Sequence, residues 1–337
     1  MLDTPSTFRS EHGFSLPELM ISVALLLIIS ASVTSGLLQM TNSQKTIWNR
    51  TQLHAGVRSA TELLQQEVGQ AGRVTLPGTV TLTAPIAVNT NIATVSSTLG
   101  MFAGERILIE PGSNEETVQI AAVNSATQFT IVRSVDSADT TVQVGTPPVS
   151  ATWFVNAHPI GAKVRVSGGF AGGIVPPAPG FLNGSTPSVL KLYGDVNGDG
   201  NMVYVEYTCD PAPGTGNLYR NVMPFDQTTA KLPPDGTQVL LSSIQPNPNN
   251  TPCFTYMPNP LPVVTSSGID NTYVLDVAIT LTVQTQTRDP ITNQFQLETK
   301  ALLNVSPRNV FNVWQLASSG IHAKVQPMPP TVAALLP

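Results

Sequence analysis

The sequence has few charged residues. Asp, Glu, Lys and Arg make up 11% of its 337 residues, against about a quarter in ordinary soluble domains. The net charge is −5, so the chain lacks the basic excess that would attract nucleic acid, and no nucleic acid partner is expected. Hydrophobic residues make up 41%, with 25 glycines and 29 prolines. This composition, with its many Thr and Val residues, is typical of an exported β protein.

Motifs of common enzymes are also missing from the sequence. The four histidines are scattered and show no H-E-x-x-H or other spacing of zinc ligands. There is no G-x-S-x-G nucleophile motif, and the acidic residues show no obvious catalytic pairing. We therefore expect a protein that is not an enzyme and that requires no cofactor.

Cysteine is scarce, with only Cys209 and Cys253 in the chain. Two cysteines in an exported protein are expected to form a disulfide. Neither cysteine belongs to a C-x-x-C pair, so redox catalysis is not indicated. The two cysteines are 44 positions apart. A structural disulfide that closes a loop of this length stabilises a fold by about 4 kcal/mol in the chain-entropy model.

One long uncharged run lies near the N-terminus. No residue from Leu19 through Gln44 carries a charge, and a helix needs about 20 apolar residues to cross a bilayer. An ordinary signal peptide has a shorter apolar core of roughly 7–15 residues. A plain membrane anchor explains the length of the run but not Glu18 at its start. Because a charge at a helix centre costs about 2.5–3.5 kcal/mol, and less near the interface, this acid needs a partner.

The residues around Glu18 resemble a known processing signature. The stretch GFSLPEL, beginning at Gly13, is similar to the cleavage and methylation motif of type IV prepilins and of the pseudopilins of type II secretion. The resemblance implies that a prepilin peptidase cuts between Gly13 and Phe14 and methylates the new N-terminus at Phe14. It also implies that Glu18 meets the N-terminal amine of a neighbouring subunit during assembly. A carboxylate beside a cationic amine is far less costly in a membrane than a carboxylate alone.

The same resemblance supplies the expected location of the protein. The leader, residues 1–13, has Arg9 as its one firm positive charge, against Asp3 and Glu11. Since positive charge marks the cytoplasmic side, this leader gives a weak orientation signal and departs from the family pattern. The resemblance implies a single-pass protein of the bacterial inner membrane, with its C-terminal domain outside the cytoplasm before it enters a pilus or pseudopilus.

A single long helix is expected to follow the leader. Residues 14–40 form its membrane-spanning half, in which Pro17 suits the first turn because it removes an N–H that has no helical partner. Residues 41–72 form an amphipathic half that ends at Ala71, with Gly72 as the stop signal. One face is predicted to pack on a soluble domain, and it comprises Ile47, Leu53, Val57, Ala60, Leu64, Val68 and Ala71. The opposite face is predicted to hold Arg50, Arg58, Glu62, Gln66 and Glu67.

The rest of the chain reads as short strands and turns. We expect a β-rich insertion over 73–166, a pilin-like β domain over 167–310 and a C-terminal tail over 311–337, of which residues 325–337 are expected to be loose. A hairpin turns at 111–114, with Glu115 and Glu116 at its solvated tip, and another strand is expected at 140–145. A final hairpin has a buried face formed by Tyr273, Leu275, Val277, Ile279, Leu281 and Val283, then by Phe295, Leu297, Ala301, Leu303 and Val305. The predicted fold class is α+β and pilin-like, with a long N-terminal helix packed on an antiparallel β-rich domain.

A further motif suggests a metal site. The stretch DVNGDGNMVYVE, beginning at Asp195, fits the calcium-loop pattern D-x-[DN]-x-[DN]-G-x5-E. Its flanks alternate as strands, so it is no helix–loop–helix EF-hand. The alternative is a hairpin whose Asn-Gly and Asp-Gly pairs serve turn geometry alone, although that alternative requires neither Asp195 nor Glu206. The predicted Ca²⁺ ligands are Asp195, Asn197, Asp199, Asn201 and Glu206.

The size and architecture look most like PilW-type minor pilins. The segment SPRNVFNVW, beginning at Ser306, resembles the closing segment of PilW-like pilins and of J-type pseudopilins. The resemblance implies a structural subunit that primes pilus assembly at the tip, with the prepilin peptidase, other minor and major pilins and the inner membrane as partners. One alternative is a J-type minor pseudopilin of type II secretion, whose usual chain is shorter. Another is an adhesin or ligand-binding module mounted on a pilin helix.

Overall fold

The computed structural model describes most of the chain. Gly13, Phe14 and the strand expected at 140–145 lie outside the described residues, which are 15–134, 153–177, 183–225, 231, 236–258 and 273–334. The chain divides into two compact units. The first comprises Met1–Gln52 with Thr285–Gln296, and the second comprises Leu53–Gln284 with Leu297–Pro337.

The first element is helix α1, Leu16–Gln70. Pro17 lies in its first turn, as predicted. The helix ends one residue before Ala71, and Gly72 has a φ of +81°, the left-handed conformation that favours glycine after a helix. A Cβ at Gly72 would lie 2.9 Å from the side chain of Val310, so close packing also favours glycine here.

Within the first unit, the loop Thr285–Gln296 contacts the helix. The hydroxyl of Thr287 donates to Oδ1 of Asn49 at 3.1 Å, and Nε of Arg50 donates to Oε1 of Gln296 at 2.9 Å. Further along the helix toward its N-terminus, the large apolar side chains from Leu16 to Met40 are exposed. This part of α1 therefore has no buried stripe of its own.

Within the second unit, the C-terminal part of α1 carries most of the predicted buried face. Every predicted member of that face from Leu53 to Ala71 is buried in the main core. Two predictions for this helix were wrong. Ile47 is 65% exposed, and Glu67, which was assigned to the solvent face, is 2% exposed.

Glu67 is buried because two strands bring partners to it. Tyr207 donates its hydroxyl to Oε2 of Glu67 at 2.5 Å, and Arg220 donates from Nε to Oε1 at 3.0 Å and also from Nη2. A buried carboxylate is tolerated where it is paired and hydrogen-bonded. Burial, together with the Glu67 carboxylate, raises the pKa of Tyr207. The partners lie 140 and 153 residues along the chain, so helical periodicity could not reveal them.

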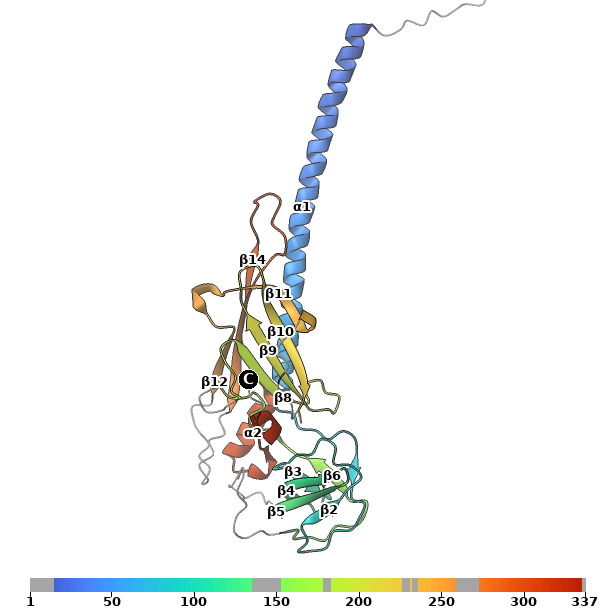
Figure 1. Ribbon diagram of the computed structural model, residues 1–337, viewed down its shortest axis with the longest axis vertical. Coiled ribbons are helices and arrows are strands. Elements are labelled where there is room, and N and C mark those ends of the chain that lie inside the picture. The colour runs from blue at the N-terminus through green and yellow to red at the C-terminus, as the bar shows by residue number, and fades with distance from the viewer. Residues whose placement is uncertain are drawn as a thin grey trace, which may run out of the picture. The chain divides into compact units, whose positions relative to one another are not determined.

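The helix packs against a seven-stranded sheet whose described pairings are antiparallel (Figure 1). Its strand order is β12-β13-β11-β10-β9-β8, and β14 also pairs with β13. The strands are β8 (Val189–Gly194), β9 (Val203–Asp210), β10 (Gly216–Pro224), β11 (Val239–Gln245), β12 (Phe254–Pro258), β13 (Val274–Gln284) and β14 (Leu297–Val305). The 3-10 helices η1 (Gly236–Gln238) and η2 (Pro248–Asn250) flank β11.

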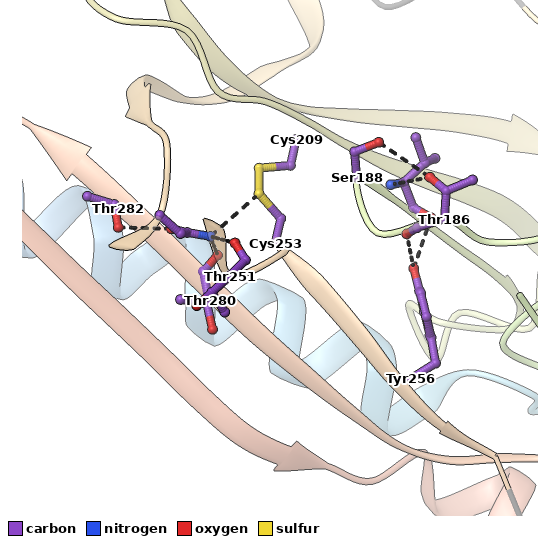
Figure 2. The surroundings of a disulfide bond; sticks show 10 residues. Thr186, Ser188, Cys209, Thr251, Cys253, Tyr256, Thr280 and Thr282 are labelled. Atoms are coloured by element: carbon purple, nitrogen blue, oxygen red, sulfur yellow. Dashed lines mark hydrogen bonds between the residues drawn. A yellow bond between two sulfur atoms is a disulfide. The ribbon is translucent and has the colours of Figure 1, made fainter. Parts of the chain in front are cut away.

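The predicted disulfide joins β9, the strand next to one end of this order, to the start of β12 at the other end. Cys209 lies on β9 and Cys253 directly precedes β12. Beside the bond, the Tyr256 hydroxyl donates to the carbonyls of Thr186 and Val189 at 3.0 and 2.9 Å (Figure 2). These contacts bring the β12 end of the sheet to the chain that leads into β8. The sheet thus curls, and the disulfide and Tyr256 hold its ends together.

The final hairpin, β13–β14, is present, but its second strand faces differently from the prediction. Leu297 is 64% exposed and Ala301 is exposed, whereas Leu302 packs against the core. The register shifts between Val277 and Ile279, which pair with Val305 and Leu302, so β14 has one extra residue there. Because an extra residue inverts the alternation of a strand, the predicted odd-numbered face turns outward beyond this bulge.

The region after α1 forms a second sheet of six strands, with its own hydrophobic core. The predicted hairpin at 111–114 joins its strands β3 and β4, which pair antiparallel. The strand order is β1-β6-β3-β4-β5-β2. The strands are β1 (Val80–Thr81), β2 (Ile92–Thr94), β3 (Arg106–Ile109), β4 (Glu116–Ser125), β5 (Gln128–Ser134) and β6 (Lys163–Val166).

The prediction of a solvated tip was wrong for Glu116, which is 4% exposed. Its carboxylate accepts the backbone N–H groups of Val155 and Asn156 at 2.9 and 3.0 Å, and lies 3.1 Å from Nε2 of His158. The other ring nitrogen of His158 lies 2.8 Å from Glu110, and this hydrogen bond lowers the pKa of Glu110. A distant segment covers the tip, which local sequence cannot show.

Residues 325–337 of the C-terminal tail were predicted to be loose, and this was wrong for the described ones, 325–334. After α2 (Arg308–Ser318) and η3 (His322–Lys324), strand β15 (Val325–Gln326) pairs in parallel with β7 (Gly169–Phe170). The buried side chain of Gln326 accepts the N–H of Arg106 at 2.8 Å and donates to its carbonyl at 2.6 Å. In α3 (Pro330–Ala334), Val332 is fully buried. The tail thus fixes β3 to the rest of the second unit.

Candidate assembly segment and calcium loop

The assembly segment is built on the first turns of α1. Glu18 lies in the first turn, where the helix dipole favours negative charge. Its backbone carbonyl accepts a hydrogen bond from the hydroxyl of Ser22 at 2.8 Å. The Ser22 hydroxyl therefore has a hydrogen-bond partner within the helix. The cleavage residues Gly13 and Phe14 precede the described part of the chain. The geometry therefore places Glu18 close to the N-terminal end of the helix and leaves the cleavage position as a prediction.

Helix α1 is long and apolar enough to cross a membrane, by length and composition. None of its most apolar stretch is buried within the protein, which sets it apart from the core helix of a soluble domain. A signal sequence near the N-terminus can also form an apolar helix, so apolar character alone fits both an anchor and a signal sequence. The sequence motif around Glu18 is what distinguishes this helix from an ordinary signal sequence.

The candidate calcium loop connects β8 to β9, whose last pair is Gly194 with Val203. Asp195 is fully buried, and its carboxylate accepts the N–H groups of Asp199 and Gly200 at 3.0 and 3.3 Å. Nε of Arg73 lies 3.5 Å from the same carboxylate. Asp195 therefore closes the turn and pairs with Arg73, three residues after the end of α1.

Asp199 lies at the tip of the same loop and accepts the N–H of Asn201 at 2.8 Å. Asn201 is exposed, and Gly198 and Gly200 have φ values of +74° and +88°, which suit glycine in a tight turn. Both the calcium hypothesis and the turn alternative need these glycines, so their geometry does not separate the two.

Glu206 is not brought to the other predicted ligands. It lies on β9 opposite Lys191, and its Oε1 accepts hydrogen bonds from the Tyr204 hydroxyl and from Nζ of Lys231, each at 2.6 Å. Within the described ranges, no three His, Cys, Asp or Glu side chains lie close enough together to hold a metal ion. Calcium binding stays a prediction, and the loop must rearrange if Glu206 is to take part.

A group of buried polar residues around Lys191 was missed by the sequence reasoning. Lys191 is 5% exposed, and burial, together with the charge of Lys231, lowers its pKa to about 8. Its Nζ donates to Oδ1 of Asn183 at 3.2 Å. One signal was available, because Lys191 interrupts an apolar run on β8 between Leu190 and Leu192.

Comparison with known proteins bears on the N-terminal segment. A family model described as the prokaryotic N-terminal methylation motif matches residues 8–34. No match was found among curated proteins or among solved structures. The matched range contains Gly13, Phe14 and Glu18, and the motif points to a structural protein rather than an enzyme. It also implies processing by prepilin peptidase and assembly with other pilins, and together with the apolar helix it fits membrane anchoring. The motif supports a prepilin-type protein, which is a type IV pilin or a pseudopilin.

Proposed function

We propose that this protein is a PilW-type minor pilin that helps to prime pilus assembly at the filament tip. The observation that carries the proposal is the methylation motif over residues 8–34 at the head of a long apolar helix. Along the chain, a six-stranded sheet is inserted after α1 and before the strands of the main sheet. This extra sheet supports a minor over a major subunit, because a filament built of many copies needs a compact body. We assign it no catalytic role.

The proposed assembly contact joins Glu18 to the N-terminal amine of Phe14 in a neighbouring subunit. Both groups would lie within the membrane or the filament core, where an isolated charge is costly and a pair is much less so. The exposed apolar side chains from Leu16 to Met40 support this role, since they would be covered by lipid before assembly and by other pilin helices afterwards.

A J-type minor pseudopilin of type II secretion is the alternative supported by the same motif. The extra sheet over β1–β6 argues against it, because J-type chains are usually shorter. If the neighbouring genes encode tip minor pilins and a large tip adhesin, the pilus assignment is favoured. The adhesin alternative would use the β1–β6 sheet as its binding face.

Processing provides the first test. The full chain is co-expressed with a prepilin peptidase, and the N-terminus of the product is determined by mass spectrometry. The expected mature chain begins at methylated Phe14. An intact leader, or a cut between Ala31 and Thr41, would contradict the prepilin assignment itself.

The assembly role of Glu18 is tested in the same cells. Glu18→Ala is expected to leave cleavage intact and to remove most of the protein from sheared filaments, because the amine of the neighbouring subunit loses its partner. The control is Glu62→Ala, which changes an exposed glutamate on the same helix. Normal filament entry of Glu18→Ala would refute the pairing role while leaving the processing result unaffected.

A further inference from the structure

Five polar side chains form a largely buried cluster at the edge strand β8. Asn183 is 1% exposed, Lys191 is 5% exposed and Tyr204 is fully buried. The side chains of Lys231 and Glu206 are 8% and 12% exposed. Lys191, Lys231 and Tyr204 each form a hydrogen bond with the side chain of Asn183, and Glu206 contacts Lys231 and Tyr204.

We propose that Lys191 and Asn183 form an intramolecular isopeptide cross-link. In the reaction, Nζ of Lys191 attacks Cγ of Asn183 and forms a C–N bond. The bond between Cγ and Nδ2 breaks, one proton passes from Nζ to Nδ2, and Nδ2 leaves as ammonia. The electron pair of the broken bond leaves with that nitrogen, so no oxidant or other reactant is needed. This inference does not depend on the proposed function.

Both the position and the pKa of Lys191 suit it to act as the nucleophile. Its Nζ lies 3.2 Å from Oδ1 of Asn183, so the amine already contacts the amide that it would attack. Burial and the positive charge of Lys231 lower the pKa of Lys191 to about 8. The lower pKa increases the fraction of neutral, nucleophilic amine at pH 7 over that of an ordinary lysine.

Lys231 is placed to stabilise the negative charge that develops on Oδ1. Its Nζ lies 2.5 Å from Oδ1 of Asn183 and 2.6 Å from Oε1 of Glu206. Because Lys231 contacts both the Glu206 carboxylate and Oδ1 of Asn183, we assign it the role of hydrogen-bond donor and not that of a second nucleophile. Glu206 acts here as a positioning residue for Lys231.

Tyr204 is placed to relay the proton to the leaving group. Nδ2 of Asn183 lies 3.0 Å from the Tyr204 hydroxyl, which in turn donates to Glu206 at 2.6 Å. The Tyr204 hydroxyl thus bridges the Glu206 carboxylate and the nitrogen that leaves, so it can pass a proton between them. Nδ2 also donates to the carbonyl of Val332 at 2.9 Å, which holds the amide in one orientation.

The cross-link would tie the chain before β8 to β8 itself. Strand β8 lies at the edge of the seven-stranded sheet, where it pairs with β9 alone in the strand order. A covalent tie there constrains the unfolded chain, as a disulfide does. It would also resist peeling of the edge strand under load.

The test is tryptic mapping of the purified full chain after reduction and alkylation. Trypsin does not cut after an acylated lysine, so the cross-linked protein should yield residues 166–220 as one peptide. That peptide should weigh less than its sequence by one ammonia, and its fragmentation should place the link between Asn183 and Lys191. An unmodified peptide that ends at Lys191 would overturn the proposal.

A competing reaction is separated by the same map. Asn183 precedes Gly184, and cyclisation of Asn183 onto the backbone nitrogen of Gly184 would also release ammonia. That product leaves Lys191 free for trypsin, so loss of ammonia with normal cleavage after Lys191 overturns the proposal. A link to Lys231 instead of Lys191 would overturn the assignment of the nucleophile.

Substitutions distinguish loss of the cross-linking reaction from loss of folding. Lys191→Arg keeps the charge but cannot form the amide, and it should abolish the mass loss, whereas Lys163→Arg, an exposed control, should not. Lys231→Met should slow cross-linking by roughly a hundredfold after refolding, as expected for loss of one donor to a developing oxyanion. Circular dichroism of each variant checks that it is folded. An unchanged rate in folded Lys231→Met would refute the role of Lys231.

Discussion

The two halves of α1 are parts of one helix that meet different surroundings. From Leu16 to Met40 the large apolar side chains are exposed, whereas from Leu53 onward one face is buried against the main sheet. In the first half, apolar residues occupy the whole circumference, as in a helix that lies in lipid or among other helices. In the second half they form a stripe, and the residues between them are polar.

The difference also changes what a glutamate can do. Glu18, in the first half, lies in the first turn, and its proposed partner is in another subunit. Glu67, in the second half, is buried and bonded to Tyr207 and Arg220 of the same chain. A charge in apolar surroundings needs a partner. Glu67 has its partners in the same chain, whereas the partner proposed for Glu18 belongs to another molecule.

The largest expected difference in stability is between two leucine-to-alanine substitutions, one in each half of the helix. Leu64 is fully buried and Leu26 is 62% exposed. Leu64→Ala should lower the free energy of unfolding by about 4 kcal/mol through lost burial and a cavity. Leu26→Ala should change it by less than about 0.5 kcal/mol. Denaturant unfolding of the full chain in detergent measures both, and equal losses would break the comparison.

A smaller effect is expected from removing a glutamate in the buried half. Glu67→Ala leaves Arg220 and Tyr207 without their shared acceptor. It should cost about 3 kcal/mol, at the low end for a buried pair because Arg220 is 24% exposed.

The control is Glu62→Ala, which removes only an exposed pair with Arg58 and should cost less than about 0.5 kcal/mol. The same unfolding curves give both values. If Glu67→Ala matched Glu62→Ala, the buried network would not contribute to stability.

The smallest expected effect concerns the loop beyond the end of the buried half, where Asp195 meets Arg73. If Ca²⁺ binds there, a calcium concentration ten times the dissociation constant should stabilise the protein by about 1.4 kcal/mol. Asp199→Ala should remove this gain, because it removes a carboxylate at the loop tip. Isothermal titration and thermal unfolding of the full chain measure it. Absence of both heat and stabilisation in the wild type would leave the loop as a turn.

Local sequence was sufficient for the elements whose signals lie within a few residues. The uncharged run and the proline at position 17 predicted the start and the exposed half of α1, and Gly72 predicted its end. Strand alternation predicted the β3–β4 and β13–β14 hairpins. The two cysteines predicted the disulfide, since there was one way to pair them. The motif match at residues 8–34 rests on the same kind of local signal.

Local sequence failed where a distant segment covers a residue. Helical periodicity assigned Glu67 to solvent, and its position at a hairpin tip assigned Glu116 to solvent, but strands and loops from elsewhere in the chain bury both. The alternation of β14 was inverted by one bulge at its pairing with β13, which depends on the partner strand. The tail appeared loose because its prolines and short apolar runs have no period, yet it packs beside β7.

The sequence by itself determined that this chain has a prepilin-type N-terminus, a long helix with an apolar head and a β-rich body. Each of these depends on composition, periodicity or a short motif that is complete within one segment. Only the tertiary structure decided which polar groups are buried together, including the pairing of Glu67 with Arg220 and the contact of Lys191 with Asn183. The physical reason is that burial is a property of contacts between distant segments, and it is burial that makes a charge need its partner and that lowers the pKa of a lysine amine.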